Sequence, residues 1–303
     1  MVLAIPVLDA TSRAQHGLFT RAQALSAGLS PRQISYRVNI GAWQEVHRHV
    51  YRSRAIASTW HSEVLAAVLA SGGVASHKVA IALWDLDVYH TPPVEISVPN
   101  QKWFRCGDVI SHRSTQWGLR DQVTIDGIPT TGVERSILDV ANVTSPEYLE
   151  RIAEAAIRQR KTDWMALANC LRKHSKQGRN GCLSLRRLLQ FRLETKTVPL
   201  SDFSRLIEQL LVSHGIPAPV IEYRILDSDG AHVLQTDLAW PTKKKAIELD
   251  GLRWHFGRED VERDRRKRNR AKAEGWSILE VLWSMYIDEP ADLVRTVQRF
   301  LRA

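Results

Sequence analysis

The spacing of apolar positions changes several times along the chain and predicts a protein of mixed helices and strands. Over residues 60–71 and 199–215 apolar side chains recur every three to four positions, which is typical of helices that bury one face. Over residues 220–240 they fall into two short strand-like runs separated by the turn sequence DSDG. The chain has 303 residues, more than a single hydrophobic core usually organises, so we expect several domains.

Residues 17–52 predict two short helices followed by a β-hairpin. Thr20 is a favourable N-cap for the first helix, and Ser30 with Pro31 is a favourable start for the second. The alternating sequence WQEVHRHVYR then predicts the hairpin. This order is that of a winged helix-turn-helix, in which the second helix enters the major groove and the wing meets backbone phosphates.

We expect a small core between these helices and the hairpin, and an outer face that contacts double-stranded DNA. A helical docking module with a solvated basic surface is the open alternative. The expected core positions are Ala24, Leu25, Leu29, Ile34, Val38, Trp43, Val46 and Val50. The expected DNA-contacting side chains are Arg32, Gln33, Ser35, Tyr36 and Arg37 on the second helix and Arg48 on the wing.

The glycine before the first helix, the AGLS turn and the VYR of the wing resemble the AbiEi antitoxin family. The resemblance extends in pattern over residues 13–193, and it implies DNA binding, repression of the protein's own operon and a cognate toxin as partner. We therefore expect a winged-helix domain over residues 1–53 and a mostly helical AbiEi-like middle domain with some strands over residues 54–200. Three histidines of this middle region, at positions 77, 90 and 112, are scattered in the sequence and are interpreted as partly buried or surface side chains.

Carboxylates gather in the strands of the C-terminal region. If the link between two of these strands turns at Thr242 and Lys243, Asp237 lies opposite Glu248, and the two-residue period places Asp250 on the same face. Carboxylates at neighbouring positions repel one another, and Mg²⁺ or Mn²⁺ with oxygen ligands would compensate them. The following sequence GREDVERDRRKRNRAK predicts an arginine-rich helix suited to phosphate, so the combination favours metal-assisted phosphodiester hydrolysis.

The sequences TDLAWP, IELDG and GWSILEVLW, with the histidine and arginines between them, resemble the PD-(D/E)xK nuclease superfamily over residues 201–302. They look most like domains related to the very-short-patch-repair endonucleases. The resemblance implies a nuclease-like αβ sandwich over residues 201–303, with Asp237 and Glu248 as Mg²⁺ ligands and Asp250 beside them. It also implies acid/base or phosphate-orienting work for His255, and it implies that Arg258, Arg265 and Arg268 hold phosphate or brace the site. Lys245, beside the predicted turn, is a further expected phosphate contact.

Two departures from the superfamily pattern keep a second interpretation open. Asp250 stands where the superfamily has a lysine, and Ser204 stands where this branch often has a glutamate, although Glu208 lies one turn later on the same helix face. Without both helpers the C-terminal region would be a catalytically degenerate nuclease fold in an antitoxin or transcriptional repressor. Asp237 and Glu248 would then be structural, and the arginines would form i,i+4 pairs on a solvated helix.

Composition supports a polyanionic partner without identifying it. The chain has 42 lysine and arginine residues against 33 aspartate and glutamate residues, a formal charge of +9. Its three cysteines include no C-x-x-C pair, so we expect reduced thiols rather than a disulfide framework or a zinc knuckle. The sequence lacks a basic, apolar leader and long apolar runs, from which we expect a cytoplasmic location without a membrane anchor.

Overall fold

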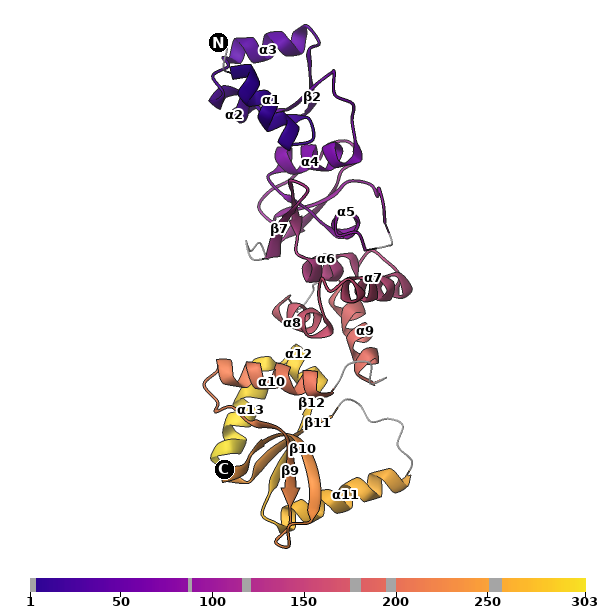
Figure 1. Cartoon of the computed structure of the whole chain (residues 1–303), viewed down its shortest axis with the longest axis vertical. Coiled ribbons are helices and arrows are strands. Elements are labelled where there is room, and N and C mark those ends of the chain that lie inside the picture. Colours follow the sequence, from indigo (N-terminus) through magenta and orange to yellow (C-terminus); the bar gives the residue numbers. More distant parts are fainter. Residues whose placement is uncertain (1–3, 87–88, 116–120, 175–180, 195–199, 251–257) are drawn as a thin grey trace. The chain divides into compact units, whose positions relative to one another are not determined.

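The chain divides into two compact units, Met1–Thr162 and Asp163–Ala303 (Figure 1). The computed structural model describes residues 4–86, 89–115, 121–174, 181–194, 200–250 and 258–303. Three sheets and helices α1 to α13 make up the described part, so the expected mixture of helices and strands is confirmed. None of the described helices combines the length and the apolar character needed to cross a bilayer.

The first unit begins with the predicted winged helix-turn-helix. Both helix starts are confirmed, because Thr20 with Gln23 and Ser30 with Gln33 form capping boxes that pair backbone N–H groups at the helix ends. The strands form an antiparallel three-stranded sheet in the order β1-β3-β2. The elements are α1 (Ala4–Ala14), β1 (Leu18–Thr20), α2 (Arg21–Ser26), α3 (Pro31–Asn39), β2 (Trp43–His47) and β3 (Val50–Ser53).

The core of this segment is largely the predicted one. Its buried members include Ala24, Leu29, Ile34 and Trp43, together with Leu8, Phe19 and Tyr51. The expectation for Leu25 is wrong, because its side chain is 39% exposed on the outer side of α2. Helix α1 was not predicted, and it contributes Leu8 to the core.

The rest of the first unit holds a five-stranded sheet in the order β6-β5-β4-β8-β7. Helix α4 is buried along most of its length, and its side chains share a core with Leu18 and Val50 of the winged segment. Thr130 and Thr131 pair with β7 at the end of β8, and α6 begins at Val133. The elements are α4 (Trp60–Ser71), β4 (Val74–Ala75), α5 (His77–Leu83), β5 (Glu95–Pro99), β6 (Ile110–Ser114), β7 (Gln122–Ile125), β8 (Ile128–Thr131), α6 (Val133–Val140) and α7 (Pro146–Arg158).

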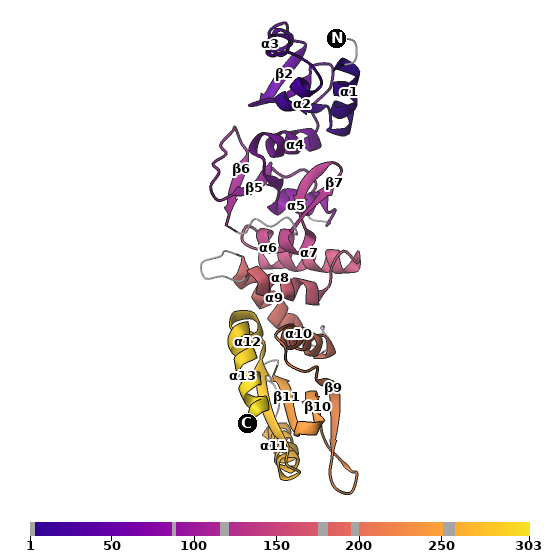
Figure 2. The same ribbon diagram turned by 90° about the vertical axis from the view of Figure 1, so that its left-hand side faces the viewer.

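The second unit contains a four-stranded sheet in the order β12-β11-β10-β9 (Figure 2). Strands β9, β10 and β11 pair antiparallel, and β12 pairs parallel with β11 after the crossover through α11. The predicted order of helix, hairpin, third strand, arginine-rich helix and final strand is thus present. The elements are α8 (Trp164–His174), α9 (Cys182–Glu194), α10 (Leu200–Ser213), β9 (Val220–Leu226), β10 (His232–Trp240), β11 (Lys245–Asp250), α11 (Arg258–Ala273), β12 (Ser277–Leu282), α12 (Trp283–Asp288) and α13 (Pro290–Arg302).

The two faces of this sheet pack against different helices. Ala239 and Ala246 form a core with Ala271 of α11, so α11 covers the face to which odd-numbered β10 and even-numbered β11 residues point. The Lys245 ammonium lies 4.9 Å from the ring centre of Phe300 in α13, so α13 lies against the opposite face. The assignment of this unit to a nuclease fold stays a prediction.

Candidate functional site

Helix α3 presents a polar face away from the core of the winged segment. Ile34 is buried at 1% exposure on its inner side, whereas Arg32 and Ser35 are exposed and Tyr36 is 63% exposed on the outer side. A tyrosine held this far into solvent is not explained by packing. The outer face of α3 therefore has the long, polar and basic side chains that a DNA groove would accept.

Two of the predicted contact residues also stabilise the local fold. Gln33 accepts the Ser30 backbone N–H through its side-chain oxygen at 2.8 Å, as part of the capping box. The Arg37 guanidinium lies 5.2 Å from the centre of the Trp43 ring, a cation–π contact between α3 and the wing. This contact orients the guanidinium before any ligand binds.

The wing ends in a tight turn that exposes Arg48. The turn residues Arg48 and His49 lie between β2 and β3, and His49 has a left-handed backbone with φ of 66°. Its N–H donates to the Glu45 carboxylate at 2.7 Å, which fixes the turn. Arg48 is thereby held at the tip of the hairpin, the position from which wings contact phosphate.

The second unit brings Asp237 and Glu248 to adjacent strands, as predicted. Residues Pro241 to Lys244 link the strands through a 3₁₀ turn, and the register of Trp240 opposite Lys245 sets Asp237 opposite Glu248 when continued along the strands. The Asp237 carboxylate accepts the Leu249 backbone N–H at 2.7 Å. Asp237 therefore supports the end of β11 as well as adding negative charge there.

Arg268 of α11 neutralises much of this charge. Its Nε lies 2.6 Å from Glu248 Oε2, and its guanidinium also contacts Glu280, the residue opposite Glu248 in β12. The Glu248 side chain is only 15% exposed, so the ion pair lies in a partly desolvated position. The predicted bracing role of Arg268 agrees with this geometry.

The other predicted residues of this site lie in several places. Lys245 points to the opposite face of the sheet, toward Phe300, so the structure does not bring it to the carboxylates. Arg265 is exposed on α11, and Glu208 is half-buried on α10 near the buried Ser204. His255 lies outside the described residues, and so do the side chains of Asp250 and Arg258.

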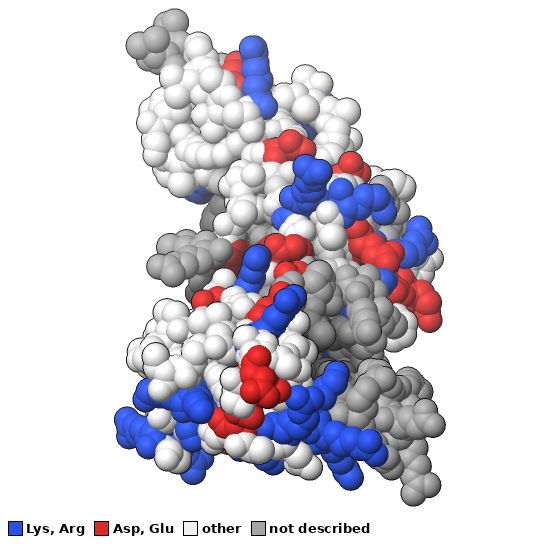
Figure 3. All heavy atoms as spheres, turned by 60° about the horizontal axis from the view of Figure 1, so that its bottom comes forward, with Lys and Arg blue, Asp and Glu red and all other residues white. Residues whose placement is uncertain are grey.

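Positive side chains gather around a smaller acidic group in the lower part of the space-filling view (Figure 3). Exposed basic residues near the carboxylate strands include Lys243, Lys244, Arg266 and Lys272. Among them, Lys243 Nζ donates to the Leu301 carbonyl at 3.2 Å, and Lys244 Nζ donates to the Glu274 carbonyl at 2.8 Å. These basic side chains lie on the turn between β10 and β11 and on α11.

Comparison with known proteins addresses the winged segment directly. Residues 7–54 match the family model of a transcriptional regulator, the AbiEi antitoxin. The match covers the elements from α1 to the end of the wing, so the AbiEi resemblance is confirmed for this segment. Extension of the resemblance into residues 55–193 stays a prediction.

Two relatives from strains of Mycobacterium tuberculosis match along nearly the whole chain. Each is described as an uncharacterized protein and is 22% identical over 273 residues, which is 90% of this chain and 97% of the relative. The similarity thus extends into both compact units. This similarity does not indicate an activity for the chain, because the names of the relatives state none.

Sequence reasoning missed one group of titratable side chains. His77 and His112 were interpreted as scattered side chains, yet they lie together with Glu95 in the first unit, with their ligand atoms within 4.8 Å of one another. Among the side chains that the structure describes, it is the one gathering of three potential metal ligands. Their spacing in the sequence gives no metal-binding motif, because the pairing of β5 with β6 and the packing of α5 on β5 bring them together.

Proposed function

We propose that the protein is a transcriptional regulator that binds double-stranded DNA at its own promoter through the AbiEi-type winged helix. The observation that carries this proposal is the outer face of α3, where Arg32, Ser35 and Tyr36 are exposed beside the basic wing. The match of residues 7–54 to a regulator family supports it. A cognate toxin protein is the partner that an antitoxin-type regulator would have.

The expected binding mode has two parts. Side chains of α3 would read base edges in the major groove, and Arg48 on the wing would contact the backbone. The formal charge of +9 favours association with a polyanion, and the phosphate contacts should make the affinity strongly dependent on salt.

Fluorescence anisotropy with labelled duplexes tests the proposal. We expect the full chain to bind a duplex from the region upstream of its own gene more tightly than a shuffled duplex of equal length and composition. The preference should persist in the presence of a chelator, because α3 reads bases without a metal ion. Equal affinity for both duplexes at every salt concentration would contradict sequence-selective regulation.

A second function, metal-dependent cleavage of DNA, is favoured by one specific observation. Asp237 and Glu248 lie on adjacent strands, on the sheet face covered by the arginine-rich α11. Their oxygens suit Mg²⁺ or Mn²⁺, which would polarise a phosphate and supply a bound water. Arg268 forms an ion pair with Glu248, so it would have to release this carboxylate when a metal ion binds there.

Cleavage is checked with supercoiled DNA in Mg²⁺, Mn²⁺ or EDTA. If the second function holds, the wild type nicks DNA only with metal, and Glu248→Ala or Asp237→Ala lowers the rate by a large factor because a metal ligand is gone. Asp229→Ala, which removes an exposed carboxylate from the β9–β10 turn, is the matched control and should cleave like the wild type. A folded wild type that binds DNA without nicking it would rule out the nuclease and leave the regulator.

A further inference from the structure

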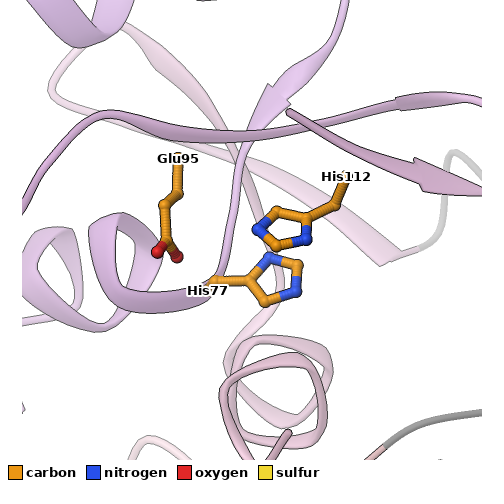
Figure 4. A group of neighbouring side chains, drawn as sticks. All are labelled: His77, Glu95 and His112. Carbon is orange, nitrogen blue, oxygen red and sulfur yellow. The ribbon is translucent and has the colours of Figure 1, made fainter. Parts of the chain in front are cut away.

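Three side chains that could hold a metal ion converge inside the first unit (Figure 4). His77 is the first residue of α5, Glu95 the first of β5, and His112 lies in the middle of β6. Glu95 is 4% exposed and His77 is 7% exposed. They lie far from the winged-segment face and from the carboxylates of the second unit in sequence, and neither proposed function uses them.

The sheet places two of them on one face. Strands β5 and β6 are parallel, with Ser97 opposite His112. Because side chains alternate along a strand, Glu95 points to the same face as Ser97. Glu95 and His112 therefore lie on one face of the sheet, two residues apart in register. Helix α5 packs on β5, and its first residue brings the third side chain to this face.

The backbone at His77 is left-handed. Its φ is 53°, a value that is uncommon outside glycine, although asparagine, aspartate and histidine adopt it more often than other residues do. A left-handed residue other than glycine persists where the surrounding structure imposes it, and such residues cluster at functional sites. At His77 the conformation turns the imidazole toward β5 and β6.

Hydrogen bonds orient the ligand set. The Ser97 hydroxyl donates to Ser76 Oγ at 2.9 Å, and Ser76 Oγ lies 2.9 Å from His77 Nδ1. When His77 carries its proton on Nδ1, this N–H donates to Ser76 Oγ, and Nε2 is the ring nitrogen left to bind a metal ion. The Glu95 carboxylate accepts the Lys78 backbone N–H at 3.1 Å, which fixes one oxygen.

His112 has a buried ring nitrogen in need of a ligand. Its Nε2 is shielded from solvent and has no hydrogen-bond partner among the described residues. A buried polar atom left without a partner is costly, and a metal ion would satisfy it.

We propose that His77, Glu95 and His112 form a binding site for a divalent transition-metal ion of the Zn²⁺ class, with water in the fourth position. Two imidazoles and one carboxylate are a donor set that suits Zn²⁺ better than Mg²⁺, which prefers oxygen ligands. This site is chemically distinct from the Asp237 and Glu248 pair, and the proposal does not depend on either proposed function.

Binding requires a local rearrangement of the side chains. The His77 and His112 rings are stacked, with centroids 3.6 Å apart and an interplanar angle of 20°. Tetrahedral Zn²⁺ with bonds of about 2.1 Å separates its ligand atoms by about 3.4 Å, which is compatible with the separations of at most 4.8 Å here, but one ion cannot lie in the planes of two stacked rings. A rotation that unstacks the rings would bring both nitrogens and the carboxylate around one ion.

The test uses the full chain, freed of metal with a chelator and then titrated with Co²⁺, whose visible absorption reports nitrogen and oxygen ligation. We expect one equivalent to bind with a visible band, Zn²⁺ to displace it, and either ion to raise the melting temperature. His112→Ala and the more conservative Glu95→Gln should each weaken binding at least tenfold.

Matched variants identify the site. His90→Ala removes an exposed histidine of the same unit, and Cys106→Ser removes the thiol that lies 3.1 Å from His47 Nδ1. Both should keep the band and the stoichiometry. Absence of Co²⁺ binding by the wild type would overturn the proposal, and so would an unchanged band in both His112→Ala and Glu95→Gln.

Discussion

Arg32→Ala combined with Arg37→Ala is expected to weaken binding to the upstream duplex by about 30-fold or more, taking at least about 1 kcal/mol for each arginine. Arg32 is exposed on the outer face of α3, and Arg37 is oriented by the Trp43 ring 5.2 Å away. Losing base contacts lowers specificity, and losing phosphate contacts lowers the slope of log affinity against log salt. Anisotropy titrations at three salt concentrations measure both.

The control for charge is Arg151→Ala combined with Arg158→Ala. Both arginines lie on α7 in the same unit, are exposed, and lie outside the winged segment. The control removes the same net charge, so its affinity should change far less than that of the α3 variant. Equal losses in the two variants would mean that net charge, rather than α3, determines binding.

Arg135→Ala is expected to destabilise the first unit by about 3–5 kcal/mol, because it leaves a buried carboxylate without its cation. Arg135 Nε donates to both Asp139 oxygens at 2.9 and 2.8 Å, and each of the two side chains is 8% exposed. Arg135 also donates to Ser114 Oγ at 3.1 Å, so it ties α6 to β6. Urea denaturation measures the loss, and hydrogen exchange in peptides from α6 assigns it to this unit.

The double variant Arg135→Met with Asp139→Leu tests whether Arg135→Ala loses stability because the buried Asp139 charge is left unpaired. Apolar side chains of similar size remove both charges at once, and such replacements are often close to neutral in stability. We therefore expect the double variant to be clearly more stable than Arg135→Ala. A double variant as unstable as the single one would show that the arginine acts through packing and its contact with Ser114.

The features that were predicted correctly depend on residues that are close together in the sequence. Helix starts at Thr20 and Ser30 depend on hydrogen bonds within three residues, so the residue types alone indicate them. The register that sets Asp237 opposite Glu248 was also predicted, although the link is four residues long and contains a 3₁₀ turn. A short connection leaves few registers that keep the apolar face inward.

Long-range pairing explains what the sequence did not predict. His77, Glu95 and His112 are seventeen to eighteen positions apart on one helix and two parallel strands, and no local pattern encodes that register. The choice of Glu248 and Glu280 as partners of Arg268 likewise depends on the crossover from β11 through α11 to β12. Leu25 was assigned to the core from helical spacing, but α2 has only six residues and turns that side chain outward.

The strand order of the second unit leaves β9 at an edge of its sheet. An edge strand offers unpaired backbone groups to any other extended chain, and apolar edges promote aggregation. On β9 the exposed Val220 and Leu226 would favour such pairing, but the exposed Glu222 and Arg224 lie between them, and Glu222 has a left-handed φ of 54°. Charge and a backbone kink thus protect the edge against strand addition, so a chain that replaced both residues with valine would be prone to self-association although its core was intact.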